Sequence, residues 1–234
     1  MVTTEAVILA GGFGTRLLAV VQDVPKPMAP VCGRPFLEFQ LDYLAAHGIQ
    51  HVVLSTGYLS DVIAVHFGSQ YKSIKLDYAV ETDPLGTGGA IAFAAEKIHG
   101  NCFWVLNGDS LFEVDLPEME KQHFEGINDF SLALRNVDDV SRYGEVETDA
   151  KGKIIAFNEK NSQSKPGYIN GGVYFLQKEA LLKYSPKGKF SIEKEIFMDT
   201  NNPLVMKGFY SDGYFIDIGI PTDYQRAQYE FRNR

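Results

Sequence analysis

The chain of 234 residues has little of what several classes of protein require. Its two cysteines, Cys32 and Cys102, are too few and too far apart for a C-x-x-C metal or redox motif. Its five histidines, at positions 47, 51, 66, 99 and 123, show no H-E-x-x-H or paired spacing. We expect each histidine to be a surface or core residue, which argues against zinc chemistry and histidine-based nucleophilic catalysis.

Basic charge and long apolar runs are also scarce. Lys and Arg number 22 against 30 Asp and Glu, for a formal net charge of −8, and no basic stripe could follow a nucleic-acid backbone. The N-terminus has no basic segment followed by an apolar one, and no long apolar run occurs elsewhere. We expect a soluble cytoplasmic protein, monomeric or homodimeric, that binds neither nucleic acid nor membrane.

The apolar residues, 45% of the chain, can form one sizeable core. In the first half, helical patterns such as 35–48 alternate with apolar runs at 5–10, 51–56, 74–80 and 102–107. This alternation predicts parallel strands joined by crossovers. From about residue 130 the runs are shorter and β-rich, at 130–136, 144–148, 153–157 and 168–176, before one final helix at 222–232. Asp149-Ala150-Lys151-Gly152 indicates a hairpin turn.

A glycine-rich turn directly follows the first apolar run, Ala6 to Leu9. It reads Leu9-Ala10-Gly11-Gly12-Phe13-Gly14-Thr15-Arg16-Leu17. Glycines let the backbone approach a ligand closely and point successive N–H groups at an anion, and Arg16 adds positive charge. The segment lacks the spacing and the Gly-Lys-Ser/Thr ending of a Walker loop. Taken alone, it is equally well explained as a tight turn or as a phosphate cradle.

A lysine held between two prolines, Pro25-Lys26-Pro27-Met28, changes that balance. The prolines keep the backbone extended, so Lys26 is aimed rather than mobile. Together, the glycine turn and this segment resemble the signature of the sugar-1-phosphate nucleotidyltransferases. The resemblance implies that the glycine loop and Arg16 hold a nucleoside triphosphate and that Lys26 contacts phosphate.

Further blocks resemble the family in the family's order, over nearly the whole chain. They are Asp83 to Ala90, Val105 to Asp109, Arg142-Tyr143-Gly144, Asn158-Glu159-Lys160, Asn170-Gly171-Gly172 and Phe215 to Gly219. The stretch Phe190 to Lys194 belongs to a more detailed resemblance, to the heptose 1-phosphate guanylyltransferases. The resemblance implies an α/β, Rossmann-like (GT-A-like) fold with a mixed central sheet flanked by helices. It also implies one catalytic domain over 1–234, with a nucleotide-binding half at about 1–125 and a sugar-phosphate-binding half at about 126–234.

Site residues follow from the same blocks. The expected nucleotide-binding set is Leu9, Ala10, Gly11, Gly12, Gly14, Thr15, Arg16, Glu81, Pro84, Gly86, Thr87 and Gly108. Asp109 and Asp217, at two strand ends, are expected to hold Mg²⁺, which prefers hard oxygen ligands, with Glu113, Asp115 and Asp212 as less favoured alternatives. The catalytic set is Arg16, Lys26, Asp109 and Asp217.

The expected sugar-phosphate site is Gly144, Glu159, Lys160, Asn170 and Gly171, with Arg142 and Tyr143 as neighbours. Lys160 would contact phosphate, Glu159 and Asn170 would receive sugar hydroxyls, and the two glycines would leave space for the ring. The attacking group needs no general base, because a phosphate monoester, with a second pKa near ~6, is mostly a dianion at neutral pH.

The identity of the base is predicted from Glu81, and that of the sugar from a more detailed resemblance. Glu81 precedes the base-binding segment, and a carboxylate accepts hydrogen bonds from the adjacent N1–H and N2–H₂ donors of guanine but meets the carbonyl oxygens of uracil. In detail the chain resembles the guanylyltransferases that act on a heptose 1-phosphate. Those that act on mannose 1-phosphate are the nearest alternative, followed by uridylyl- or thymidylyltransferases for a hexose 1-phosphate.

Two other classes are considered. A glycosyltransferase would usually carry an Asp-x-Asp motif, and the sequence has none. A silent nucleotide-sugar sensor should have lost Arg16, Lys26, Asp109 or Asp217, and all four are present.

Overall fold

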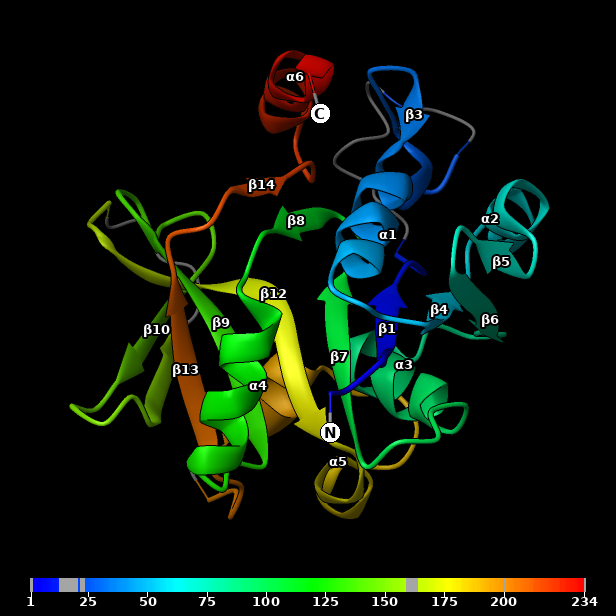
Figure 1. Ribbon diagram of the computed structural model, residues 1–234. Coiled ribbons are helices and arrows are strands. Elements are labelled where there is room, and N and C mark those ends of the chain that lie inside the picture. Colours follow the sequence, from blue (N-terminus) through cyan, green and yellow to red (C-terminus); the bar gives the residue numbers. More distant parts are fainter. Residues whose placement is uncertain (1, 13–20, 22–23, 159–163, 200, 234) are drawn as a thin grey trace.

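An eight-stranded mixed sheet forms the centre of the protein (Figure 1). The computed structural model describes residues 2–12, 21, 24–158, 164–199 and 201–233. The strand order is β13-β9-β12-β7-β1-β4-β6-β5. These strands are β1 (Glu5–Leu9), β4 (His51–Thr56), β5 (Gln70–Tyr71), β6 (Ile74–Val80), β7 (Cys102–Asn107), β9 (Phe130–Val137), β12 (Gly167–Gln177) and β13 (Met206–Ser211).

The first half of the sheet is parallel, as the alternating pattern predicts. β1 pairs in parallel with both β4 and β7, and β4 pairs in parallel with β6. Every residue of β4 is buried, which is typical of a strand covered on both faces. The four predicted strands of this half are confirmed to within one residue at their ends.

Helices cover both faces of the sheet. They are α1 (Phe36–Ala46), α2 (Ser60–Phe67), α3 (Gly86–Ala95), α4 (Leu116–Glu125), α5 (Lys178–Tyr184) and α6 (Pro221–Glu230). Because successive side chains of a strand point to opposite faces, Ile8 joins the core formed with α1 and α4, and Val7 joins the core formed with α3 and α5. The mixed, helix-flanked sheet predicted from the sequence is confirmed.

The second half adds antiparallel strands to the same sheet. β12 pairs antiparallel with β7 on one side and with β9 on the other, and so joins the two halves. β10 (Glu145–Thr148) and β11 (Ile154–Asn158) form a separate hairpin. Its turn is the predicted one, with Gly152 at φ +79° and its N–H donating to the carbonyl of Asp149 at 2.9 Å.

Short elements complete the upper edge of the molecule in Figure 1. β8 (Ser110–Phe112) pairs antiparallel with β14 (Phe215–Asp217), and β2 (Pro30–Val31) with β3 (Arg34–Pro35). The predicted final helix begins one residue early, at Pro221, and ends at Glu230, where a turn of 3₁₀ helix (Phe231–Asn233) follows. Other short helices are a 3₁₀ turn at Lys26–Met28 and a π turn at Glu193–Phe197.

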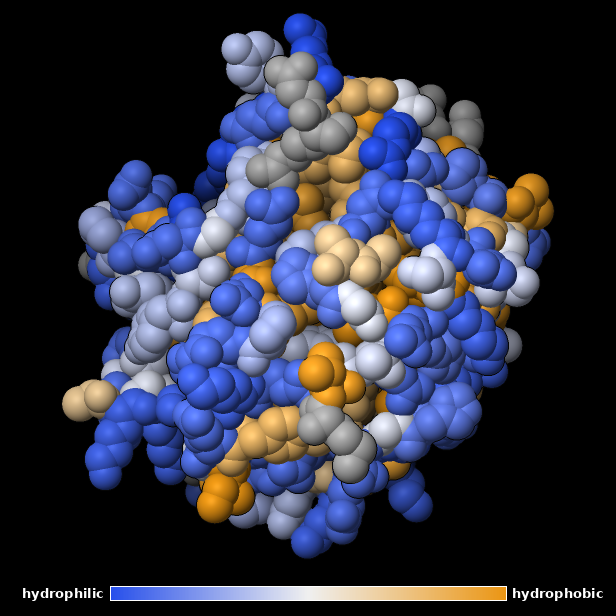
Figure 2. All heavy atoms as spheres, viewed as in Figure 1, coloured by the Kyte–Doolittle hydropathy of each residue, from blue (hydrophilic) through white to orange (hydrophobic). Residues whose placement is uncertain are grey.

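Among the described residues, no helix has both the length and the apolar character needed to cross a bilayer. On the face drawn in Figure 2, hydrophilic side chains cover most of the surface, and the visible hydrophobic ones lie in small groups.

Candidate active site

Three adjoining cavities follow the carboxyl-terminal edge of the parallel strands, the usual position of a ligand site in a sheet of this kind. The first, of about 190 Å³, is lined by Leu9, Gly11, Gly12, Glu81, Pro84, Gly86, Thr87 and Ala90. The second, of about 210 Å³, is lined by Leu9, Gly12, Lys26, Pro27, Thr87, Asn107, Gly108 and Asp109. The third, of about 380 Å³, is lined by Asn107, Asp109, Ser110, Tyr143, Phe157, Asn170, Gly171, Glu193, Phe215 and Asp217.

Neighbouring cavities share lining residues, so they form one continuous site. Leu9, Gly12 and Thr87 line both the first and the second, and Asn107 and Asp109 line both the second and the third. The site thus runs from the predicted base-binding segment, past Lys26, to the predicted sugar-binding segment. The predicted residues Gly14, Thr15, Arg16, Glu159 and Lys160 lie outside the described residues.

Glycine is required where backbone segments meet at this site. A Cβ on Gly108 would lie 2.4 Å from the carbonyl oxygen of Leu9, because the turn after β7 packs directly against the end of β1. Gly86 has φ +72°, and a Cβ there would lie 2.5 Å from the carbonyl oxygen of Phe190. Any side chain at these positions would push apart the walls of the first two cavities.

Ala10 lies in the core rather than in the wall of the site. It lines none of the three cavities. Ala10 is fully buried, and its N–H donates to the carbonyl of Ser55 at 2.7 Å, which continues the pairing of β1 with β4. Its side chain and its N–H are therefore already engaged, and a contact between Ala10 and the nucleotide stays a prediction.

Glu81 organises the wall of the first cavity. Its Oε2 accepts a hydrogen bond from the N–H of Leu85 at 2.8 Å, and its Oε1 accepts one from the hydroxyl of Ser55 at 3.2 Å. These bonds fix the 82–85 loop against β4. A carboxylate offers about four lone-pair positions, so recognition of the base by the remaining ones stays a prediction.

Lys26 is aimed into the second cavity, as the flanking prolines predict. Its ammonium forms an ion pair with a carboxylate oxygen of Asp109, and only 9% of its side chain is exposed. Pro25 is extended at φ −65° and ψ 150°, and Pro27 and Met28 are buried, so the 3₁₀ turn that carries Lys26 is anchored on both sides.

Asp109 and Asp217 are brought together by the β8–β14 pair. Ser110 is opposite Asp217 in that ladder, and the N–H of Ile218 donates to the carbonyl of Asp109 at 2.9 Å. A Cβ on Gly219 would lie 2.6 Å from Asp217 Oδ1 and 2.8 Å from Lys26 Nζ. Asp217 and the Lys26 ammonium therefore meet at Gly219, where the missing side chain leaves them room, and the ion pair with Lys26 places Asp109 beside them.

The less favoured metal ligands do not share this site. Asp115 caps α4 by accepting from the N–H of Glu118 at 3.0 Å. Asp212 is 98% exposed beside Arg135. Glu113 and Asp115 line a different cavity, described below. Asp109 and Asp217 supply hard oxygen donors in one pocket, which is the donor set that Mg²⁺ prefers.

A model of the nucleotidyl transferase family matches residues 5–234. The chain belongs to this family. The family assignment made from the sequence motifs is therefore confirmed.

Close relatives within the family match nearly end to end. The chain is 44% identical to a D-glycero-α-D-manno-heptose 1-phosphate guanylyltransferase of Aneurinibacillus thermoaerophilus, over 98% of this chain and 99% of that one. It is 40% identical to the Campylobacter jejuni protein of the same name, over 94% of this chain and 96% of that one. The crystal structure of HddC from Yersinia pseudotuberculosis complexed with GMP-PN is 38% identical and matches with a TM-score of 0.87, over 98% and 100% of the two chains.

In the third cavity of this nucleotidyl transferase, Asn170 has the predicted position. It lies where β12 bulges, and its amide donates to the hydroxyl of Tyr174 at 2.7 Å while its Oδ1 accepts from the N–H of Gly172 at 3.0 Å. Burial raises the pKa of Tyr174, which keeps that hydroxyl neutral. Asn170 is therefore held rigidly in the cavity wall.

The two sugar-site glycines also have structural roles. Gly171 lines the third cavity, and a Cβ on it would lie 2.2 Å from the ring of Phe112, so glycine is also needed there for packing against β8. Gly144 does not line the cavity, has φ +87° and donates its N–H to the carbonyl of Val140 at 3.0 Å, so glycine is needed there for a turn. Its neighbour Tyr143 lines the cavity instead.

Glu193 is a site residue to which the sequence reasoning assigned no role. It lines the third cavity, and its Oε2 accepts from the hydroxyls of Thr87 at 2.6 Å and Ser191 at 2.7 Å. Thr87 lines the first two cavities, so this hydrogen bond joins the nucleotide side of the site to the sugar side. The Phe190–Lys194 block was the available signal, but it did not show which of its residues faces the cavity.

Arg142 and Tyr143 act as neighbours of the site, as predicted. Arg142 pairs with Asp223 at 2.5 Å, and this bond raises the pKa of the guanidinium, which lies 5.2 Å from the ring centre of Tyr143. The pair ties the turn before β10 to α6 and holds Tyr143 in the wall of the third cavity.

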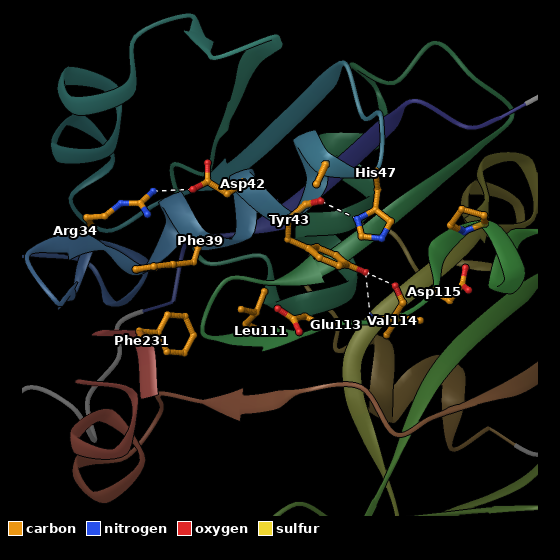
Figure 3. Close-up of a pocket in the computed structure, with 12 residues that line it drawn as sticks. Arg34, Phe39, Asp42, Tyr43, His47, Leu111, Glu113, Val114, Asp115 and Phe231 are labelled. Carbon is orange, nitrogen blue, oxygen red and sulfur yellow. Dashed lines mark hydrogen bonds and ion pairs between the residues drawn. The ribbon is translucent and has the colours of Figure 1, made fainter. Parts of the chain in front are cut away.

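A larger cavity, of about 750 Å³, lies elsewhere, between α1, the end of β8 and the C-terminal 3₁₀ turn (Figure 3). Its polar groups are already paired, since Arg34 binds Asp42 at 2.7 Å and the hydroxyl of Tyr43 donates to the carbonyl of Val114 at 2.7 Å. No residue predicted as catalytic lines it, so we do not assign the reaction to this cavity.

The histidines are absent from the three adjoining cavities within the described chain. His123 is fully buried behind the sheet, where its Nδ1 contacts the hydroxyl of Ser131 at 2.9 Å, and burial lowers its pKa to about 4. It is a neutral core residue, as predicted.

Proposed function

We propose that the protein transfers a guanylyl group from GTP to D-glycero-α-D-manno-heptose 1-phosphate and releases pyrophosphate. The observation that carries the proposal is the continuous line of cavities in which Lys26, Asp109 and Asp217 stand between the nucleotide side and the sugar side. Two relatives with matching length that are named heptose 1-phosphate guanylyltransferases support the choice of both substrates. The HddC complex with GMP-PN supports the guanine base.

The chain's own residues would mainly bring anions together. The glycine turn after β1 and Thr87 would border the triphosphate, and Tyr143, Asn170 and Glu193 would border the sugar. The nucleophile is already an anion, so binding in line with the α-phosphorus is the principal requirement. No proton needs to be removed, so the proposal requires no histidine among the residues that line the three cavities.

The metal requirement belongs to the same proposal. Asp109 and Asp217 would hold Mg²⁺, which supplies charge neutralisation shared by both substrates. Lys26, which pairs with Asp109 in this structure, would then be free to turn toward the phosphates. There its ammonium would stabilise the negative charge of the leaving pyrophosphate. In this proposal Asp109 exchanges the Lys26 ammonium for the metal ion, which explains why the two side chains are in direct contact when no ion is bound.

The test is pyrophosphate release with four nucleoside triphosphates, each paired with heptose, mannose and glucose 1-phosphates in the presence of Mg²⁺. We expect turnover to be greatest with GTP and the heptose 1-phosphate. A clear preference for mannose 1-phosphate would change the sugar assignment and leave the reaction class intact. Absence of pyrophosphate release with every pair would reject the proposed function.

A further inference from the structure

A group of metal-ligating side chains lies at the opposite edge of the sheet from the active site. Glu5 begins β1, His51 begins β4, and His99 lies in the turn before β7. One ligand atom from each lies within 4.8 Å of the others. In a parallel sheet the starts of the strands share an edge, and β4 alone separates this group from the active-site edge by roughly 17 Å at ~3.3 Å per residue.

We propose that Glu5, His51 and His99 bind a late transition-metal dication, of which Zn²⁺ is the best match, and that the bound ion ties together the starts of the central strands. Two imidazoles and one carboxylate form a common zinc donor set, with water as the fourth ligand. The site is separate from the proposed magnesium site, whose donors are carboxylates alone.

The distances between donor atoms suit a tetrahedral ion. Glu5 Oε1 lies 2.8 Å from His51 Nδ1 and 3.1 Å from His99 Nδ1. Zinc bonds of about 2.0–2.1 Å in tetrahedral geometry place ligand atoms roughly 3.3 Å apart. Glu5 Oε1 would need to move away from each imidazole nitrogen by only a few tenths of an ångström, and the ligand atoms of His51 and His99 lie within 4.8 Å of each other.

The surroundings of the ligands supply the second observation. His51 Nε2 lies 2.9 Å from Asp77 Oδ2, so the ring nitrogen that would not bind the ion already faces a carboxylate. Histidine ligands of metals usually have such a partner, which fixes the tautomer and orientation of the ring. Asp77 in turn receives the ammonium of Lys75 at 2.8 Å, which holds that carboxylate in place.

Glu5 is oriented by the backbone before any ion arrives. Its Oε2 accepts the N–H of Gly100 at 2.6 Å, which turns Oε1 toward the two histidines. The N–H of His99 also donates to this carboxylate, at 3.1 Å from each of its oxygens. The ligand carboxylate is thus held in place by the turn that carries His99.

Access is provided from one side only. The side chains of Glu5 and His51 are 13% and 10% exposed, whereas that of His99 is 79% exposed. His99 also borders an open surface cavity of about 570 Å³ with Gly100, Asn101 and Lys178. A hydrated ion can therefore enter past His99 and keep one water as its fourth ligand.

The test is zinc binding by the full chain, stripped of metal with a chelator and dialysed against Zn²⁺ with excess Mg²⁺ to occupy carboxylate-only sites. Wild type and the variants His99→Gln and His66→Gln are compared. His66 is the matched control, because it is also exposed and contacts one glutamate, Glu38, at 3.0 Å. Metal content, the thermal midpoint and the visible spectrum of the Co²⁺ form are measured.

We expect about one zinc ion per chain and a higher thermal midpoint with zinc in wild type and His66→Gln. In His99→Gln, zinc binding should weaken at least tenfold and the intense bands of tetrahedral Co²⁺ should be lost. Asp77→Asn should weaken zinc binding by about 10–100-fold, as substitution of the partner of a metal-bound histidine usually does.

Equal zinc uptake by wild type and His99→Gln, or none by wild type, would overturn the proposal. Because His99 is exposed and lies outside the catalytic site, pyrophosphate release should be unchanged.

Discussion

Lys26 and Asp109 form a partly buried ion pair in the second cavity, where it adjoins the third. Each is predicted from the sequence to act on phosphate, one directly and one through a metal, yet in this structure each neutralises the other. The pair gives an ammonium that is 9% exposed a charged partner beside the proposed phosphate path. Because the two residues have different proposed roles, substituting each one alone should give different effects.

Lys26→Met should lower kcat for pyrophosphate release by about 10²–10³-fold, because it removes a positive charge from the leaving group. Affinity for Mg²⁺ should stay equal or rise, since Asp109 loses its competing partner. Steady-state rates over a Mg²⁺ titration measure both effects. The matched control is Lys121→Met, an exposed lysine on α4 whose partner Glu118 is 3.4 Å away. Wild-type turnover by Lys26→Met would contradict a role in catalysis.

Asp109→Asn and Asp217→Asn should each lose most turnover and require higher Mg²⁺, because an amide is a poor substitute for a charged oxygen ligand. Circular dichroism should report an intact fold. Asp212→Asn serves as the control, since that side chain is 98% exposed and lies outside the cavities. Full activity of either variant in Mg²⁺ would remove that residue from the proposed metal site.

Replacing each of the five histidines singly with Gln should leave turnover within about tenfold, a change of ~1.4 kcal/mol in the barrier. The reason is that the attacking phosphate is already an anion and needs no base. Rates are measured at saturating substrates and neutral pH. A thousandfold loss at one position, with the fold intact, would show that a histidine takes part in the chemistry.

Stability should fall as the pH drops from about 6.5 to about 4, because the folded state keeps His123 neutral while the unfolded state takes up a proton. The contribution is fully present above the unfolded pKa and amounts to roughly 2–3 kcal/mol. Urea unfolding across this range measures it. His123→Gln, whose amide does not titrate, should flatten the dependence in this window, and the exposed control His66→Gln should not. If the free energy of unfolding of His123→Gln changed with pH as steeply as that of wild type, the lowered pKa of His123 would be contradicted.

Glu81→Gln should lower kcat/KM for both GTP and inosine triphosphate, because it disturbs the bonds to Leu85 and Ser55 that hold the loop. If the carboxylate also reads guanine, GTP should lose a further factor of roughly five to one hundred, by analogy with bidentate base contacts. Inosine triphosphate lacks the 2-amino group, so comparison with GTP isolates the contribution of the contact between Glu81 and that group. A GTP to inosine triphosphate ratio equal to that of wild type would limit Glu81 to support of the loop.

The sequence was sufficient for the sheet because the parallel strands are buried on both faces and therefore contain apolar runs such as Val52 to Leu54. It was insufficient for individual site residues within a recognised block. Ala10 is buried in the core while Gly11 and Gly12 line the first cavity, because neighbours in a motif can face opposite sides of the backbone.

Contacts between residues that are far apart in the sequence could not be predicted from the spacing of motifs. Glu193 reaches Thr87 from a π turn late in the chain, and His51 meets His99 through the order of strands in the sheet. The histidines have no paired spacing in the sequence, yet two of them converge on Glu5. Strand order, rather than local pattern, decides such contacts.

The pairing of β8 with β14 also governs when the catalytic centre can exist during synthesis. Chains fold from the N-terminus as they emerge, at about 5–20 residues per second, and contacts between distant segments form late. The strands that pair with β1 can assemble while β14 is still inside the ribosome, but Asp217 cannot reach Asp109 until β14 has emerged. A nascent chain therefore contains the central parallel strands before it contains both carboxylates.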